Sequence, residues 1–436
     1  MFLTMDLTIE VFVRLPIKSL GRFKSVCKNW NAIICSLGFA KLHLQHAINT
    51  HPKDDDLSPN LFFLNYKYVR HRLFTFRTEL LKVEQMKLTH TYYVGSYPIG
   101  SSNGLICFKS YYRLGVDCLY IWNPTIQEYS CIGQRSRFFI RTLPVYWGFG
   151  YDPLSDDYKI VCLGIACDQT RTPVACIFTS RTCQWRQLEC PSHDGMNEFL
   201  LKNVDLRGPK NLPVLVGHTL YWRLDQHKFD PKYLLAFDLM TDSFETIPLP
   251  TQIPRASDRC KTRDFFICQI SQCLCACWVW TELLVVGEDE DFRLCMDVRT
   301  MERRGEDVFW KSKFTFERFI DCLPGDGPIL PKLFEFKENS KYMIIYSGFK
   351  SCYVIDLNSK PENVISTKGV EGFKFDYDKT GTIYALDCTH SLVSPIHHLT
   401  YSVEARGAKR SCRRQSGTTE ARPYRKLKYN VEAYLN

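Results

Sequence analysis

Three cysteines at alternate positions, Cys273, Cys275 and Cys277, have the residue type and close spacing that first suggest a metal site. On an extended strand this spacing puts all three thiols on one face. Zinc sites usually gather ligands from two chelating pairs, and the sequence contains no C-x-x-C pair. Because cysteine is often simply a small buried residue, we interpret the row as part of a core strand. Adjacent His397 and His398 are isolated in the sequence and receive no predicted role.

Asp156 and Asp157 form a carboxylate pair of the kind that general acid–base chemistry uses, but their context favours a turn. Adjacent residues in a strand or turn point apart, and DPLSDD (152–157) has the composition of a hairpin turn. The sequence also lacks G-x-x-x-x-G-K-[ST], a strand-linked G-x-G-x-x-G, G-x-S-x-G and H-E-x-x-H. We therefore predict no catalytic residue, no metal and no cofactor.

The composition limits the class of protein. Of 436 residues, 45% are hydrophobic and 24% are charged, which is typical of a chain that buries a sizeable core. The 29 Phe and 23 Tyr favour strands. The first residues do not resemble a secretory signal, so the 20 Cys indicate a reducing compartment. The longest uncharged run, residues 265–281, contains polar side chains and does not predict a membrane span.

The net charge of +9 is concentrated near the C-terminus. Residues 404–436 hold nine Lys and Arg but three Asp and Glu, whereas the rest of the chain is nearly neutral. This distribution does not favour nucleic-acid binding by the whole surface. Because the strand pattern is also lost at this end, we predict that residues 397–436 form a disordered basic tail.

The N-terminal residues 1–46 have the pattern of two or three short helices. Thr4 or Asp6 can cap the first, and Pro16 ends it and suits the opening turn of the next. A helical piece of this size is too small to be very stable alone, so we expect much of its apolar surface to meet something else. Apolar residues recur at helical spacing at Leu7, Val11 and Leu15, and after Pro16 at Leu20, Phe23, Cys27, Trp30 and Ile34.

From residue 60 to about 390, short apolar runs alternate with turn residues. An apolar strand, a polar turn and a returning strand recur every 57 to 59 residues, which predicts a hairpin in each unit. A second hairpin signal, small residues before an apolar strand, precedes several of these. Two hairpins make a four-stranded unit, so the repeat predicts β-propeller blades, five of them visible and a sixth that the ends can close. The turns are anchored at Asn123, Ser180, Asp238, Asp297 and Asp356.

Residues 5–44 closely resemble the F-box, a helical module. One departure is Leu3-Thr4, where the family usually has Leu-Pro before the first helix. The match is long and ordered. It comprises Leu15, Pro16, Lys18, Ser19, Leu20, Arg22, Phe23, Val26, Cys27, Lys28, Trp30, Ile33 and Phe39.

The later segments resemble the kelch-like associated domain of plant F-box proteins. The matching pieces are GSSNGLICF, LYIWNPTIQEY, GFGYDPLSDDYKIV, LLAFDLMTDSFETIPLP, LCACWVW and SLVSPI, so the resemblance extends to about residue 396. We therefore expect a mainly β protein with a small all-α N-terminal module. Its parts would be a three-helix F-box (1–46), a linker (47–60), a kelch-type, propeller-like domain (61–396) and the tail (397–436).

The resemblance implies a substrate-receptor subunit of an SCF-type cullin-RING ubiquitin ligase. Its F-box would bind a Skp-family adaptor, and through it a cullin scaffold, while the propeller captures a target protein. Such a subunit is not an enzyme and would work in the cytoplasm, the nucleus or both. Which helix face forms the core and which the contact is left open. The adaptor contact is assigned to Leu15, Pro16, Ser19, Leu20, Phe23, Val26, Cys27, Trp30 and Ile33.

Two other classes of function compete with this interpretation. Kelch-type propellers also occur in oxidases, and such an enzyme would hold a metal or cofactor in a central pocket. Alternatively, the basic tail would bind an anionic surface or a nucleic acid.

Overall fold

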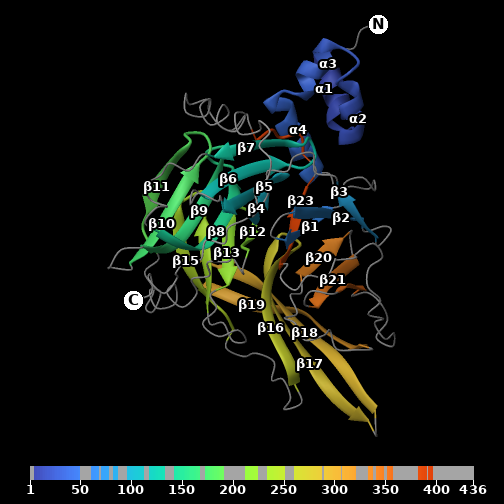
Figure 1. The fold of residues 1–436 in the computed structure, drawn as a ribbon, viewed down its shortest axis with the longest axis vertical. Coiled ribbons are helices and arrows are strands. Elements are labelled where there is room, and N and C mark those ends of the chain that lie inside the picture. The colour runs from blue at the N-terminus through green and yellow to red at the C-terminus, as the bar shows by residue number, and fades with distance from the viewer. Residues whose placement is uncertain are drawn as a thin grey trace, which may run out of the picture. The chain divides into compact units, whose positions relative to one another are not determined.

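A computed structural model describes most of the helical and strand regions of the chain (Figure 1). Three predictions fall on residues that the structure does not describe: most of the linker (residues 50–59), the pair His397 and His398, and the tail. The described residues are 4–49, 60–67, 70–77, 82–86, 96–111, 117–132, 142–166, 172–190, 212–223, 233–250, 260–286, 289–305, 307–320, 332–336, 340–347, 351–356, 382–389 and 391–395.

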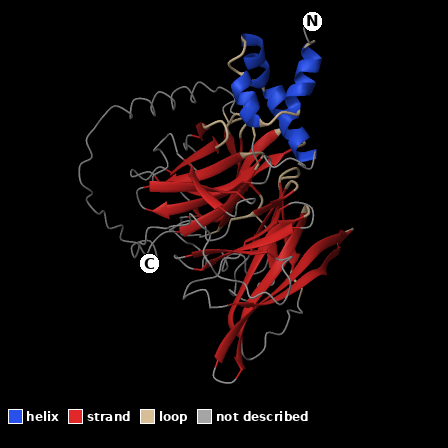
Figure 2. Ribbon diagram, turned by 90° about the vertical axis from the view of Figure 1, so that its right-hand side faces the viewer, coloured by secondary structure: helices blue, strands red, loops and turns tan. Residues whose placement is uncertain are grey.

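The helices of this part of the chain all lie before residue 50, and the remaining elements are strands (Figure 2). The expected three-helix module is therefore wrong in its helix count, because four helices form. The predicted stripe after Pro16 does not run along one helix, since Cys27 has extended backbone (φ −157°, ψ 161°) and starts a new one. The helices are α1 (Met5–Val13), α2 (Ile17–Phe23), α3 (Lys28–Ile34) and α4 (Leu37–Asn49).

The described strands form six antiparallel sheets, each joining strands that are close in the sequence except for the first. In the first sheet, β23 (Thr382–Cys388) pairs with β1 (Asn60–Lys67), so strands from the two ends of the strand-rich region meet. This sheet continues through β2 (Arg70–Arg77) to β3 (Lys82–Met86). The second contains β4 (Ser96–Ser102), β5 (Leu105–Tyr111), β6 (Asp117–Asn123) and β7 (Glu128–Ile132).

The other four sheets follow in chain order, and each is a simple antiparallel series. The third has β8 (Thr142–Asp152), β9 (Asp157–Ala166), β10 (Pro173–Thr179) and β11 (Gln184–Leu188), and the fourth has β12 (Val214–Val216), β13 (Thr219–Arg223), β14 (Tyr233–Asp238) and β15 (Ser243–Pro248). The fifth has β16 (Cys260–Ile270), β17 (Cys273–Val286), β18 (Asp289–Arg304) and β19 (Asp307–Ile320), and the sixth has β20 (Lys332–Phe336), β21 (Ser340–Ser347) and β22 (Ser351–Asp356).

The predicted turn chemistry is confirmed at two anchors. Asn123 ends β6, and its Oδ1 accepts a hydrogen bond from the Thr125 backbone N–H at 2.8 Å. Asp238 ends β14, and its Oδ1 accepts from the Met240 N–H at 2.7 Å. In both cases the side chain bonds the backbone two residues on, which is the local interaction that starts such turns.

The anchor at Asp297 is wrong, because no turn forms there. Strand β18 runs through Asp297 to Arg304, and the chain reverses around Gly305, which has φ +64°. Asp297 instead accepts a hydrogen bond from Arg299 Nε at 2.8 Å. The strands of the β18–β19 hairpin are therefore longer than predicted, and their turn comes later in the sequence than the repeat spacing indicates.

Asn123 also ties the end of the described chain to the second sheet. It is fully buried, and its Nδ2 donates to the carbonyl oxygens of Ser391 (2.9 Å) and Val393 (2.8 Å). The same segment approaches the β4–β5 turn so closely that a Cβ on Gly104 would lie 2.3 Å from that of Ser391. Gly104 has φ +78°, so both space and backbone conformation require glycine there.

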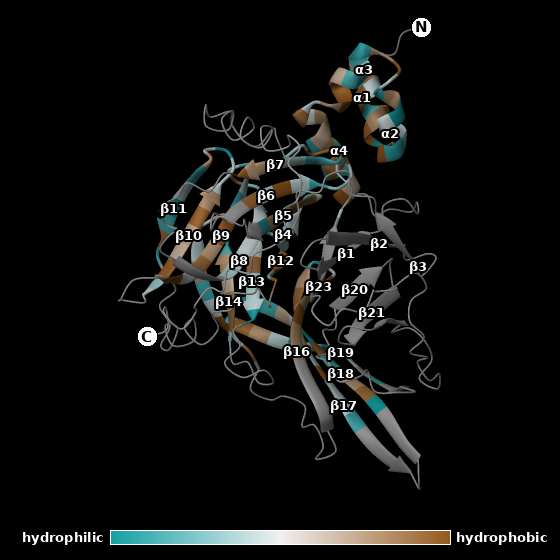
Figure 3. Ribbon diagram, viewed as in Figure 1, coloured by the Kyte–Doolittle hydropathy of each residue, from teal (hydrophilic) through white to brown (hydrophobic). Residues whose placement is uncertain are grey.

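The sheets bury most of their apolar residues within and between themselves. Every described side chain of β9 is buried, and Figure 3 shows the hydrophobic character of β9 and β10. Between the third and fourth sheets, Lys159 Nζ contacts Asp152 Oδ2 (2.7 Å), Asp242 Oδ1 (2.9 Å) and the Leu239 carbonyl oxygen (2.6 Å). This buried cation is paired on all sides, as a charge in a core must be.

Candidate functional site

The helical module is built around a cluster of aromatic side chains. The Phe12 ring lies 5.6 Å from that of Phe23, 5.0 Å from Trp30 and 6.4 Å from Phe39, measured between centroids. Phe12 and Phe39 are each 3% exposed, and Leu20 is fully buried beside them. All four helices therefore contribute side chains to this core, which also includes Ile34, Ala40 and Leu44.

Local side-chain bonds fix where two of the helices begin. Thr4 caps α1, and its Oγ1 accepts a hydrogen bond from the Leu7 N–H at 3.5 Å, which confirms Thr4 rather than Asp6 as the cap. Cys27 caps α3, where its Sγ accepts from the Trp30 N–H at 3.4 Å. These caps separate α2 from α3 and expose the connecting residues, among them Val26.

His43 of α4 joins the last helix to the α1–α2 connection. Its Nε2 lies 2.9 Å from the Leu15 carbonyl oxygen, so the neutral ring donates a proton there. Burial lowers the pKa of His43, although the bond to Leu15 opposes this effect. Its Nδ1 is buried without a hydrogen-bond partner among the described residues. The ring is therefore held neutral inside the module at neutral pH.

The nine residues assigned to adaptor binding fall into three groups. Leu20 is fully buried and supports the helix core. Pro16, Val26 and Cys27 are exposed, and Val26 is 59% exposed. A third group is half-buried and packs against the edge of the core or lies beside it. It consists of Leu15, Ser19, Phe23, Trp30 and Ile33.

Exposed apolar side chains on α1 were not assigned to the site from the sequence. Leu7 is 49% exposed and Val11 is 47% exposed, one helical turn apart on the same face. Met5, at the start of the helix, is 65% exposed. Sequence spacing had identified Leu7 and Val11 as a stripe, but a stripe alone does not distinguish a core face from a contact face.

The cysteine row lies in β17 as predicted, and Cys275 and Cys277 are fully buried. Cys268 of β16 lies beside them, with its Sγ 3.5 Å from that of Cys277. Burial raises the pKa of the Cys277 thiol, which keeps it protonated and a poor metal ligand. Among the described residues, no group of three His, Cys, Asp or Glu side chains is arranged to hold a metal ion.

The acidic pair lies in a turn, as predicted. Asp156 belongs to the β8–β9 turn and has φ +54°, and Asp157 begins β9. Asp157 Oδ1 accepts hydrogen bonds from Ser180 Oγ (2.5 Å) and the Arg181 N–H (2.9 Å). Asp156 instead accepts hydrogen bonds from the Tyr151 hydroxyl and the Lys41 ammonium, so the two carboxylates have separate partners.

Comparison with protein families matches two segments of the sequence. Residues 3–42 match the F-box domain, and residues 53–265 match the F-box associated beta propeller domain. The chain carries an F-box at its N-terminus and an F-box-associated propeller domain. The F-box covers α1 to α3 and the first half of α4, so the aromatic cluster described above is its core.

Relatives of this F-box chain are plant proteins. It is 26% identical over 314 residues to the F-box/kelch-repeat protein At3g23880 of Arabidopsis thaliana, covering 66% of this chain and 81% of that protein. It is also 26% identical to the putative F-box protein At3g16210 of Arabidopsis thaliana, covering 57% of this chain and 61% of that protein. The solved structure of TolB from Acinetobacter baumannii aligns with a TM-score of 0.34 and 9% identity, over 71% of this chain and 66% of TolB.

These similarities support an F-box substrate adaptor. None of the described helices is both long and apolar enough to span a membrane.

Proposed function

We propose that this chain is the substrate-recognition subunit of an SCF-type cullin-RING ubiquitin ligase. Its F-box binds a Skp-family adaptor, which links it to a cullin scaffold, and its propeller domain binds the protein to be ubiquitinated. We place this activity in the cytoplasm, the nucleus or both.

The observation that carries the proposal is the exposure of apolar side chains on the F-box. Leu7, Val11 and Val26 are each about half exposed, in a module of fewer than fifty residues. Leaving such side chains in water forgoes about 1.5–3 kcal/mol for each one that a partner would bury. Exposed apolar side chains of this kind are available for a partner to bury.

The chain contributes position rather than chemistry in this proposal. Holding a target close to the conjugating enzyme raises the effective concentration of its lysines without any new catalytic group. This role requires two binding surfaces on one chain, which the F-box and the sheets can supply.

The test is adaptor binding by a variant that leaves the fold intact. Val26→Asp places a charge on an exposed site, so the helices should persist while affinity for a purified Skp-family adaptor falls about 100-fold. Isothermal titration calorimetry measures the affinity, and circular dichroism checks the fold. Leu154→Asp is the matched control, because Leu154 is 73% exposed in the β8–β9 turn and should bind normally.

A second variant tests the sequence assignment directly. The Leu15→Ala and Pro16→Ala double variant should abolish adaptor pull-down, because both residues shape the start of α2. The double variant keeps the Leu15 backbone carbonyl oxygen, so the hydrogen bond from His43 to this oxygen can still form. Wild-type chain that fails to bind any Skp-family adaptor would overturn the proposal.

A further inference from the structure

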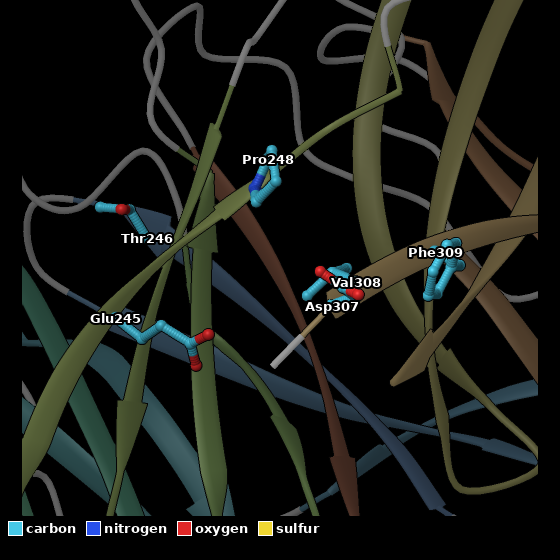
Figure 4. Close-up of a pocket in the computed structure, with 6 residues that line it drawn as sticks. All are labelled: Glu245, Thr246, Pro248, Asp307, Val308 and Phe309. Carbon is cyan, nitrogen blue, oxygen red and sulfur yellow. The ribbon is translucent and has the colours of Figure 1, made fainter. Parts of the chain in front are cut away.

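A cavity of ≈ 440 Å³ lies between the fourth and fifth sheets (Figure 4). Glu245, Thr246 and Pro248 line it from β15, and residues at the start of β19 line it from the other side. Both strands are the last in their sheets, so each has one backbone edge that no described strand covers. The β19 residues are Asp307, Val308 and Phe309.

The lining residues show that the cavity follows the strand edges rather than a sheet face. Successive side chains of a strand point to opposite faces. Asp307, Val308 and Phe309 are consecutive, yet all three border the same space. The same holds for adjacent Glu245 and Thr246 on β15. A space bordered by both faces of a strand lies beside its edge, where unpaired N–H and C=O groups are available to another strand.

Two hydrogen-bonded contacts join β15, which lines the cavity, to the β18–β19 hairpin. Both terminal nitrogens of the Arg303 guanidinium, on β18, donate to the Glu245 carboxylate, at 3.0 and 2.6 Å. Trp310 Nε1 donates to the Pro248 carbonyl oxygen at 2.8 Å. Val308 and Trp310 pack against the core of these sheets. The spacing between β15 and the β18–β19 hairpin is therefore held by a paired charge and an indole hydrogen bond, so the site is preformed.

The open side of the cavity combines an exposed carboxylate with an aromatic ring. Glu245 is neutralised by Arg303, whereas Asp307 is exposed and makes no ion pair with the residues that the structure describes. Phe309 is 48% exposed, and the Arg304 guanidinium lies 5.8 Å from its ring centroid. Asp307 and Phe309 are two residues apart, so both point to the same face of β19. This pair complements a basic and an apolar side chain at the same two-residue spacing.

We propose that this cavity binds an extended segment of the target protein, which adds as a strand to the open edge of β19. Main-chain hydrogen bonds to the edge supply affinity, and side chains at alternate positions supply specificity. A Lys or Arg of the segment lies opposite Asp307, and an apolar residue two positions away lies against Phe309. This inference rests on the proposed function, because it names the class of target segment that the propeller would recognise.

The test uses capped, fluorescein-labelled peptides and the full chain. The probe Ser-Val-Ser-Arg-Ser-Val-Ser has an apolar residue two positions on each side of its basic residue, so it fits β19 in either direction. The comparison probes carry Glu in place of Arg, or N-methyl groups on the three central backbone amides. Fluorescence anisotropy should show binding of the Arg peptide below about 1 mM, and binding at least about tenfold weaker for both comparison peptides.

Variants of the chain assign the binding to this cavity. Asp307→Lys should reverse the preference so that the Glu peptide binds more tightly, and Phe309→Ala should weaken the Arg peptide about fivefold. Glu189→Lys is the matched control, because Glu189 is an exposed carboxylate just after the outer strand β11, and it should keep the wild-type preference. No binding, equal binding of the Arg and Glu peptides, or an unchanged preference in Asp307→Lys would each overturn the inference.

Adaptor binding measured on the same preparation separates this inference from the proposed function. A chain that binds a Skp-family adaptor but prefers no basic peptide overturns the cavity assignment and leaves the proposed function intact. A chain that binds the Arg peptide through Asp307 but no adaptor supports the edge site and overturns the ligase role.

Discussion

The F-box and the sheets treat their apolar residues in opposite ways. Nine large hydrophobic side chains are exposed in the described part of the chain; five of them lie on the helices, and Val26 lies in the α2–α3 connection. In α1 the buried residues are Thr8 and Phe12, whereas in β9 every residue is buried. The sheets therefore bury most of their own hydrophobic surface. The F-box leaves part of its surface unsatisfied, and a partner can cover it.

The largest effect is expected when one buried Phe is replaced by Ala in the F-box and one in the fourth sheet. Phe12→Ala and Phe237→Ala each remove a buried ring, which costs about 3–5 kcal/mol. A hydrophobic core as small as that of the F-box supplies about 3–5 kcal/mol of folding free energy. Phe12→Ala would remove all of it, so the F-box helices should unfold. The fourth sheet has neighbours on both sides and should stay folded. Hydrogen exchange of residues 5–49 and 233–248 measures both outcomes.

Equal protection loss in the two variants would contradict the contrast. It would mean that the F-box borrows as much stability from its surroundings as the fourth sheet does.

A slightly smaller effect is expected where the sheets bury a charge. Lys159→Met leaves the buried Asp152 carboxylate without its cation and Asp242 with Arg186 alone, which should lower the free energy of unfolding by about 3 kcal/mol. Urea denaturation followed by tryptophan fluorescence measures the change. Lys311→Met is the control, because Lys311 is exposed and lies 3.8 Å from Glu302, so its loss should cost less than about 0.5 kcal/mol. A difference of under 1 kcal/mol between the two variants would argue against a structural role for the buried cation.

Sequence reasoning succeeded where the determining interactions are local. The turns at Asn123 and Asp238 form through bonds from a side chain to the backbone two residues on, and those residues are adjacent in the sequence. The Thr4 cap is equally local. Sequence reasoning failed at Asp297, because the length of a strand depends on its pairing with other strands. Strand β18 pairs with β17 and with β19 beyond the expected turn.

Exposure could not be predicted because it depends on contacts between distant elements. Leu20 and Val26 are both apolar and six residues apart, yet the first is fully buried and the second is 59% exposed. Leu20 lies in one core with Phe12 and Phe39, which belong to other helices, whereas Val26 lies in the α2–α3 connection outside that core. The cavity between β15 and β19 is harder still to predict, since its two edges are about sixty residues apart along the chain.

The buried His43 should make the F-box sensitive to acid and leave the sheets unaffected. Because burial lowers its pKa in the fold, the unfolded chain takes up a proton more readily as the pH falls below about 6.5. The F-box should therefore lose stability on acidification, by up to about 1 kcal/mol between pH 6.5 and 5.5. Hydrogen exchange of α4, corrected for the intrinsic rate, measures this change.

His43→Gln separates the titration from the structural role of the side chain. The amide can still donate to the Leu15 carbonyl but does not titrate, so the variant should be less stable at pH 7.5 and show a flatter pH dependence. An unchanged slope in this variant would assign the acid sensitivity to another group.

The smallest expected effect is at the first turn of α1, where the F-box departs from its family by having Leu3-Thr4. Thr4→Ala removes the cap that accepts the Leu7 N–H and should cost about 0.5–1 kcal/mol, whereas Thr4→Ser keeps the hydroxyl and should restore most of it. Exchange at the α1 amides measures the loss. Since Leu7 and Val11 lie on this helix, fraying it should also weaken adaptor binding in Thr4→Ala, by about two- to fivefold. If exchange rises while adaptor affinity stays unchanged, α1 stands outside the contact, and the surface around Val26 must account for the binding alone.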